Sequence, residues 1–173
     1  KPDVALIQTT PPDEQGQVNL GMAADYTLSL VRHAKLVIAE VNDQLPWVYG
    51  EGTIPASAID IFVPSERPPY EVPATQPSQT DLKVAQYVAE LVPDQATIQV
   101  GIGSLGGSIL HALKGKRGLG MHTGSISDEV IDLFESGALT GEYKEQDQGQ
   151  IVGCCLIGSS KLNQFAQKNE QLQ

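Results

Sequence analysis

The sequence predicts an α/β fold built on parallel sheets, and three observations support this prediction. Short apolar runs alternate with helical patterns along most of the chain. The strongest run, Leu36–Val41, is apolar at every position except Glu40, as in strands that are covered on both faces. A glycine-rich loop, Gly101–Gly107, joins one such run to a helical pattern, which is a common way to bind a phosphorylated ligand at a strand tip.

In the first third of the chain the pattern predicts strand, helix, strand, strand. Val4–Ile7 and Leu36–Val41 form the clearest strands, and Ile59–Val63 forms another. Asp25 caps a helix that runs from Tyr26 to about Ala34, with Leu28, Leu30 and Val31 facing inward. So few elements cannot bury both faces of a parallel sheet. We therefore expect a fragment of a longer protein, or a partner that completes the first sheet.

Prolines separate this region from the rest of the chain. The segment 64–78 should be extended and unpaired, because proline fixes φ and lacks an amide donor. We therefore predict a first domain over 1–63, a linker over 64–78 and a second domain over 79–173. The prolines of the linker are Pro64, Pro68, Pro69, Pro73 and Pro77.

Beyond the linker the alternation is more regular and predicts a doubly wound α/β arrangement. Thr80 caps the first helix, Ser127 or Asp128 caps the third, and Gly137 ends that third helix. The predicted helices are Asp81–Leu91, Ser108–Leu113, Glu129–Ser136 and one that opens at Ser159 or Ser160, and the predicted strands are Thr97–Val100, Leu119–Thr123 and Ile151–Ile157.

Composition excludes several classes of protein. The 173 residues carry a net charge of -10 and only 11 basic residues, without the clusters that nucleic-acid binding needs. No apolar run approaches the roughly twenty residues that cross a bilayer, and the N-terminus does not resemble a signal peptide. The adjacent Cys154 and Cys155 are poor disulfide partners, and we expect both to be buried in a cytoplasmic protein.

The glycine loop is compatible with three interpretations. Gly101, Gly103 and Gly106 match the GxGxxG dinucleotide pattern, but the next strand ends in Thr123-Gly124, without the acid that holds a ribose. A nicotinamide or flavin cofactor is thus one interpretation, and glycines that only form a tight turn are another. The third, a different phosphorylated or thioester ligand, is the one that we favour.

Several segments together resemble the acetyl-CoA hydrolase/transferase family, which includes 4-hydroxybutyrate and acetate CoA-transferases. The similarity extends over nearly the whole chain, in order and at family spacing. The segments that carry it are Asp3–Gln8, Pro11–Glu14 with Gly16, Asp25–Thr27, Lys35–Asn42, Gln99–Gly103, Ser127-Asp128, Val130–Leu133 and Glu135–Gly137.

This resemblance implies two Rossmann-like parallel-sheet domains of the CoA-transferase type, the first of them incomplete here, with coenzyme A and the acyl group bound between them. In such enzymes a glutamate attacks the acyl-CoA thioester, and a small carboxylate later collects the CoA. The resemblance also implies a homodimer or larger assembly and no metal. The residues that it assigns to the CoA and acyl pocket are Gly101, Ile102, Gly103, Ser104 and Leu105.

The chain departs from the family at its most important position. Gly124 stands where the family carries the nucleophilic glutamate, and Glu129 stands where the family often has glycine. Glu129 is a candidate replacement for the nucleophile, or simply an acid favoured at a helix N-terminus. Family members also continue well beyond the region that this chain resembles, into a further glycine-rich segment that contacts CoA.

Other residue types add little. His122 either donates a hydrogen bond to an acyl carbonyl or is an ordinary strand residue, and no His and Cys spacing indicates a metal site.

We therefore predict an acyl-CoA:carboxylate CoA-transferase or acetyl-CoA hydrolase family member with a changed nucleophile position. A non-catalytic CoA-binding or subunit-interaction module, and a nucleotide-dependent oxidoreductase, are the alternatives.

Overall fold

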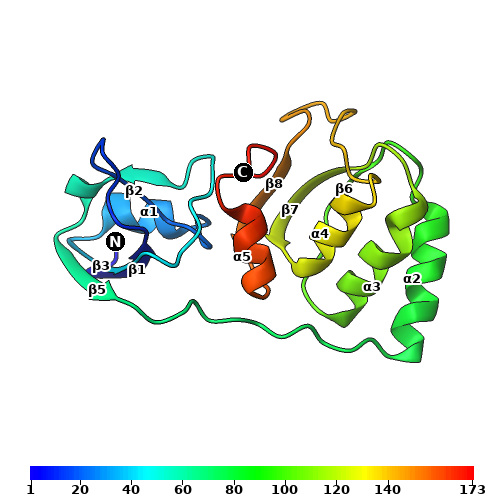
Figure 1. The fold of residues 1–173 in the computed structure, drawn as a ribbon, viewed down its shortest axis with the longest axis horizontal. Coiled ribbons are helices and arrows are strands. Elements are labelled where there is room, and N and C mark those ends of the chain that lie inside the picture. The colour runs from blue at the N-terminus through cyan, green and yellow to red at the C-terminus, as the bar shows by residue number, and fades with distance from the viewer. The chain divides into compact units, whose positions relative to one another are not determined.

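The computed structural model describes residues 1–173, which divide into two compact units (Figure 1). Unit 1 comprises Lys1–Tyr70 with Ala166–Asn169, and unit 2 comprises Glu71–Phe165 with Glu170–Gln173. No helix is both long and apolar enough to span a membrane.

Unit 1 contains a parallel sheet with the strand order β1-β3-β5 and a small antiparallel pair, β2-β4. The predicted strands and helix are therefore present, whereas the sequence patterns did not predict the antiparallel pair. The elements are β1 (Val4–Thr9), β2 (Gln17–Asn19), α1 (Thr27–His33), β3 (Leu36–Asn42), β4 (Thr53–Pro55), a 3-10 turn (Ala56–Ala58) and β5 (Ile61–Ser65).

The main sheet of unit 1 is covered on one face only. Ala5, Ile7, Val37 and Ala39 are buried in a core to which α1 contributes Val31. On the other face Ile38 of β3 is only half-buried, and Leu6 of β1 is 76% exposed. Burial on both faces, which the continuous apolar runs predicted, is therefore not seen within this chain.

Strand β5 differs from its predicted bounds. It begins at Ile61 rather than Ile59 and includes Pro64 and Ser65, which we had assigned to the linker. Pro64 pairs with Val41 at the edge of the sheet, where a residue without an amide donor is tolerated.

Unit 2 contains a second parallel sheet, in which the strand order β6-β7-β8 follows the chain. Helix α2 packs along α3, and α3 packs against α4 (Figure 1). The elements are α2 (Gln79–Leu91), β6 (Thr97–Ile98), α3 (Ser104–Ala112), a 3-10 turn (Leu113–Gly115), β7 (Gly120–Ile126), α4 (Asp128–Glu135), β8 (Ile151–Leu156) and α5 (Ser160–Ala166).

Neither parallel sheet has the reversal of strand order that defines a doubly wound fold. Parallel crossovers are right-handed, so strands added in chain order carry their connecting helices on one face. The α/β class and the parallel sheets are confirmed, and the doubly wound arrangement stays a prediction.

Several predicted boundaries in unit 2 are corrected, and β6 ends at Ile98 instead of Val100. Ser78, not Thr80, caps α2: its hydroxyl accepts from the Asp81 N–H at 3.1 Å, and the Asp81 carboxylate accepts from the Ser78 N–H at 2.8 Å. Helix α3 begins at Ser104 instead of Ser108. Strand β7 does not end at Thr123, because pairing with β8 carries it to Ile126.

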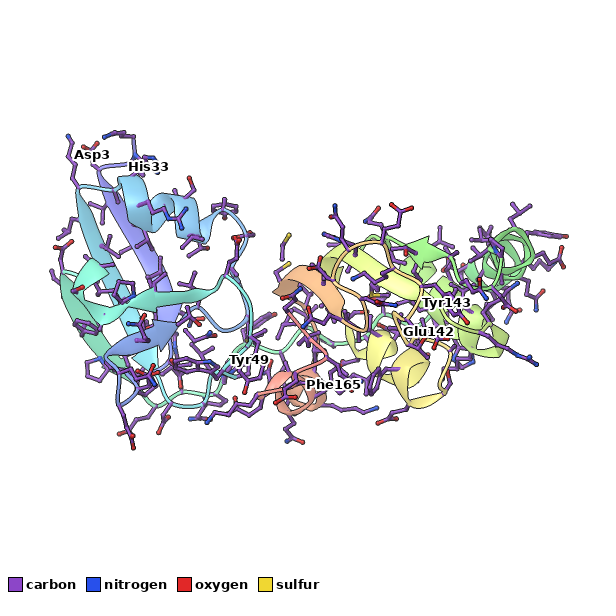
Figure 2. The ribbon with its side chains drawn as sticks, turned by 90° about the horizontal axis from the view of Figure 1, so that it is seen from above. Asp3, His33, Tyr49, Glu142, Tyr143 and Phe165 are labelled. Carbon is purple, nitrogen blue, oxygen red and sulfur yellow. The ribbon has the colours of Figure 1, made fainter.

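Aromatic contacts and loops complete the packing of unit 2. Phe165 of α5, which is labelled in Figure 2, contacts Phe134 of α4 edge to face, and the two ring centroids are 5.4 Å apart. Tyr143, which is labelled in Figure 2, lies in the loop between α4 and β8. Its ring would stand 2.7 Å from a Cβ added at Gly118, so no side chain fits there. Cys154 is exposed and Cys155 half-buried, so the prediction that both are buried is wrong.

Candidate functional site

A pocket of about 220 Å³ lies in unit 2 at the carboxyl end of the second sheet. Four segments of that unit surround it: the glycine loop with the start of α3, the junction between β7 and α4, the extended segment Val72–Thr75, and Ile157-Gly158 directly after β8. Ligands of open α/β sheets usually bind outside the carboxyl ends of the strands, so the position is that of a binding site.

Two glycines shape the junction between the glycine loop and α3, one through its backbone conformation and the other through a close contact. Gly103 precedes α3 with φ +114° and ψ 174°, a region in which residues with a Cβ are strained. A Cβ on Gly106 would overlap the carbonyl oxygen of Gly101 and approach the Val100 side chain at 3.1 Å. The first turn of α3 therefore packs directly on the loop.

Hydrogen bonds from neighbouring elements hold this loop. The Thr123 hydroxyl of β7 donates to the Val100 carbonyl at 2.9 Å. The Ser104 hydroxyl donates to the Asp81 carboxylate of α2 at 3.2 Å. Hydrogen bonds from Ser78, with a smaller contribution from Ser104, hold the pKa of Asp81 below its ordinary value. The start of α3 is thus fixed from both sides.

Two acidic side chains line the opposite wall at the start of α4. The Asp128 carboxylate accepts from the N–H and the hydroxyl of Ser159, both at 3.0 Å. The Glu129 carboxylate accepts from the Ser127 hydroxyl at 2.6 Å and lies against Gly107 of α3. A Cβ on Gly107 would stand 2.8 Å from Glu129 Oε1, so the carboxylate occupies space that a larger residue would fill.

Gly124 is exposed within β7, between the buried Thr123 and the half-buried Ser125. A Cβ added at Gly124 meets no atom within 4 Å. Its carbonyl accepts from the Cys155 thiol at 3.4 Å. Ser125 lines the pocket whereas Gly124 itself does not, and the position is open enough to take a larger side chain.

The predicted site residues are only partly brought together. Gly101, Ile102, Gly103, Ser104 and Glu129 line the pocket, whereas Leu105 and the exposed His122 do not. Sequence reasoning missed the segment Val72–Thr75, because a proline-rich stretch was predicted to be unpaired. In fact the Val72 N–H donates to the Gly158 carbonyl at 2.9 Å.

The pocket has a negative charge and no compensating cation among its lining residues. Asp128 and Glu129 are its charged residues, and the remainder is apolar, glycine or hydroxyl-bearing. No group of three His, Cys, Asp or Glu side chains is arranged to hold a metal ion. The wall favours an uncharged group over a phosphate or a carboxylate.

A second, more open cavity of about 670 Å³ lies in unit 1 at the carboxyl ends of β1, β3 and β5. There Arg67 forms two hydrogen bonds with Glu40, at 3.0 and 2.9 Å, and Gln8 donates to the same carboxylate at 3.0 Å. These bonds, with Arg67 as the largest contributor, lower the pKa of Glu40 to about 2.

Comparison with known proteins identifies the group to which the chain is similar. Residues 1–73 match the acetyl-CoA hydrolase/transferase N-terminal domain. A succinyl-CoA:acetate/propanoyl-CoA:succinate CoA transferase of Fasciola hepatica is 36% identical over 96% of this chain and 35% of its own length. The 4-hydroxybutyrate coenzyme A transferase of Clostridium kluyveri is 37% identical over 99% of this chain and 40% of its own length.

Solved structures agree with these relatives. The crystal structure of a 4-hydroxybutyrate CoA-transferase from Porphyromonas gingivalis has 33% identity and a TM-score of 0.94, over 99% of this chain and 44% of that one. RipA from Yersinia pestis has 29% identity and a TM-score of 0.93, over 98% of this chain and 40% of that one. The chain thus spans about 35–40% of the length of these curated relatives. The predicted resemblance to the acetyl-CoA hydrolase/transferase family is confirmed.

Proposed function

We propose that this chain is the part of an acyl-CoA-handling enzyme, a CoA-transferase or acyl-CoA hydrolase, that binds the acyl end of the thioester. The observation that carries the proposal is the pocket at the glycine loop, in a chain that is similar to CoA-transferases over nearly its whole length. Acyl-CoA and a small carboxylate are the proposed substrates. The names of these relatives favour a thioester ligand over the dinucleotide interpretation.

In this proposal Gly101, Ile102, Gly103 and Ser104 contact the acyl and thioester end of the substrate. Gly101 and Gly103 have no side chain, so the ligand can closely approach backbone N–H groups at the start of α3. The phosphates of CoA lie elsewhere, because no Lys, Arg or His lines this pocket.

Gly124 determines which reaction is available. Without a carboxylate there, no acyl-glutamyl anhydride forms, and transfer of CoA to a carboxylate loses its covalent route. Hydrolysis needs only water, which adds to the thioester carbonyl while the CoA thiolate leaves and takes up a proton. The lack of a side chain at Gly124 equally favours the second candidate, a module that binds CoA esters without turnover.

A free-thiol assay with acetyl-CoA and longer acyl-CoAs distinguishes these outcomes. The Gly124→Glu variant should fold normally, because the added side chain starts in open space. Thiol release by the unaltered protein would establish hydrolysis and exclude the binding module. Acetate-dependent CoA exchange by the variant alone would identify a functional pocket that lacks its nucleophile. If neither protein binds or cleaves any acyl-CoA, the proposed function is wrong.

The same proposal includes the domain assignment and the assembly. Residues 1–63 and 79–173 are taken as parts of the two Rossmann-like CoA-transferase domains, joined by 64–78, and the active enzyme as a homo-oligomer. The open apolar face of the first sheet supports an incomplete first domain, since exposed residues such as Leu6 need cover. Neither Cys154 nor Cys155 is in a disulfide, which is compatible with a cytoplasmic location.

A further inference from the structure

We propose that Glu129 selects against acyl groups that end in a negative charge, so that the pocket accepts uncharged acyl chains and rejects dicarboxylic ones. This inference rests on the proposed function, since it assumes that the acyl end of a CoA ester enters the pocket at the glycine loop. It assigns to Glu129 a role in specificity, instead of the role of a replacement nucleophile.

The position of the carboxylate carries the first step. Glu129 lines the pocket from the first turn of α4, and its Oε1 lies beside Gly107 in the first turn of α3. The Ser127 hydroxyl donates to Oε2 at 2.6 Å, which fixes the side chain on the pocket wall. An acyl chain that enters between the glycine loop and α4 must therefore pass close to this carboxylate.

The surroundings of the carboxylate carry the second step. The neighbouring acid, Asp128, is engaged by two hydrogen bonds from Ser159. No Lys, Arg or His lines the pocket, so no cation offsets either acid for an incoming anion. The other lining residues are uncharged: apolar ones such as Val100 and Leu110, glycines, and residues with a hydroxyl group. A terminal methyl group has no charge to be desolvated there, whereas a terminal carboxylate is desolvated beside a like charge, which costs free energy.

Butanoyl-CoA and succinyl-CoA form a matched pair of probes, because both acyl groups have four carbons and they differ at the terminal group. We expect the unaltered 173-residue chain to bind butanoyl-CoA at least about tenfold more tightly than succinyl-CoA, by isothermal titration calorimetry. Because the discrimination is electrostatic, it should decrease as the salt concentration rises.

Two variants test whether Glu129 causes the preference. Glu129→Gln keeps the size of the side chain and an acceptor for Ser127, and should bring the ratio of the two dissociation constants close to one. Glu135→Gln removes the same charge from the exposed last residue of the same helix, outside the pocket, and should leave the ratio unchanged.

Each outcome of this experiment has a distinct meaning. A ratio near one in the unaltered chain, or an unchanged ratio in Glu129→Gln, overturns the role of Glu129 while leaving the proposed function intact. An equal effect of Glu135→Gln would mean that net charge, not the pocket wall, determines the preference. Failure of every protein to bind either thioester refutes the proposed function itself, and the inference with it.

Discussion

Gly106→Ala should destabilise unit 2, because the glycine loop and the first turn of α3 leave no space for one methyl group. The new Cβ would overlap the Gly101 carbonyl oxygen and approach Val100 Cγ1 at 3.1 Å. The first of these contacts is with backbone, which cannot move aside by a change of rotamer. The loop or the helix must therefore shift.

The size of the effect follows from two opposing contributions. Overpacking costs about 1–3 kcal/mol and occasionally more, and a clash with backbone lies at the upper end. Alanine in a helix interior is favoured over glycine by about 1 kcal/mol, which offsets part of that cost. We therefore expect a net loss of about 2 kcal/mol, which corresponds to a decrease in Tm of about 4–8 °C for a chain of this size.

Thermal unfolding followed by circular dichroism measures this loss, and Gly101→Ala is the matched control. Gly101 belongs to the same loop, has no positive φ, and has no atom within 4 Å of an added Cβ. Its variant should unfold at or slightly above the wild-type temperature. If Gly106→Ala unfolds at the wild-type temperature, or if both variants lose the same stability, the packing argument is wrong.

Three further predictions concern the framework around the two cavities. Asn19→Ala should lower the free energy of unfolding by about 3 kcal/mol, because the buried side-chain amide forms hydrogen bonds with Val48, Thr53 and Gly21. Urea unfolding, followed by the fluorescence of the single tryptophan, Trp47, measures this loss. Ser78→Ala should cost about 1 kcal/mol and Thr80→Ala much less, by thermal unfolding, because Ser78 is the cap of α2; equal losses would contradict this. The stability that the ionised Glu40 contributes is complete above its ordinary pKa of 4.5 and is lost as the pH falls towards about 2. In Glu40→Gln the free energy of unfolding should therefore depend less on pH in that range. An unchanged acid profile in Glu40→Gln would show that the pair with Arg67 contributes nothing.

The order of strands and helices could be predicted from the sequence because it depends on local patterns. The predicted runs Val4–Ile7 and Leu36–Val41 lie within β1 and β3, and Gly137, with φ +78°, ends α4 as its position indicated. The family resemblance is likewise a property of the sequence, since it depends on residue types in order. The substitution of glycine at position 124 is visible there without any structure.

Pairing between distant segments was decided only by the tertiary structure. Strand β7 continues through Gly124 because β8 pairs with Ser125 and Ile126, and no local signal near Thr123 reports that partner. The antiparallel pair β2-β4 is equally non-local, since Val18 pairs with Ile54. Short strands of this kind have weak periodicity and form through their partners.

The composition of the candidate site also depended on three-dimensional contacts. The sequence predicted the glycine loop, because glycines at a strand-to-helix junction have a local backbone reason to be there. It could not predict that Glu129 would lie against Gly107, or that Val72 would pair with Gly158 and bring the linker to the pocket. The residue types of a site are therefore readable from the chain, whereas its walls and its charge balance arise from packing between elements far apart in sequence.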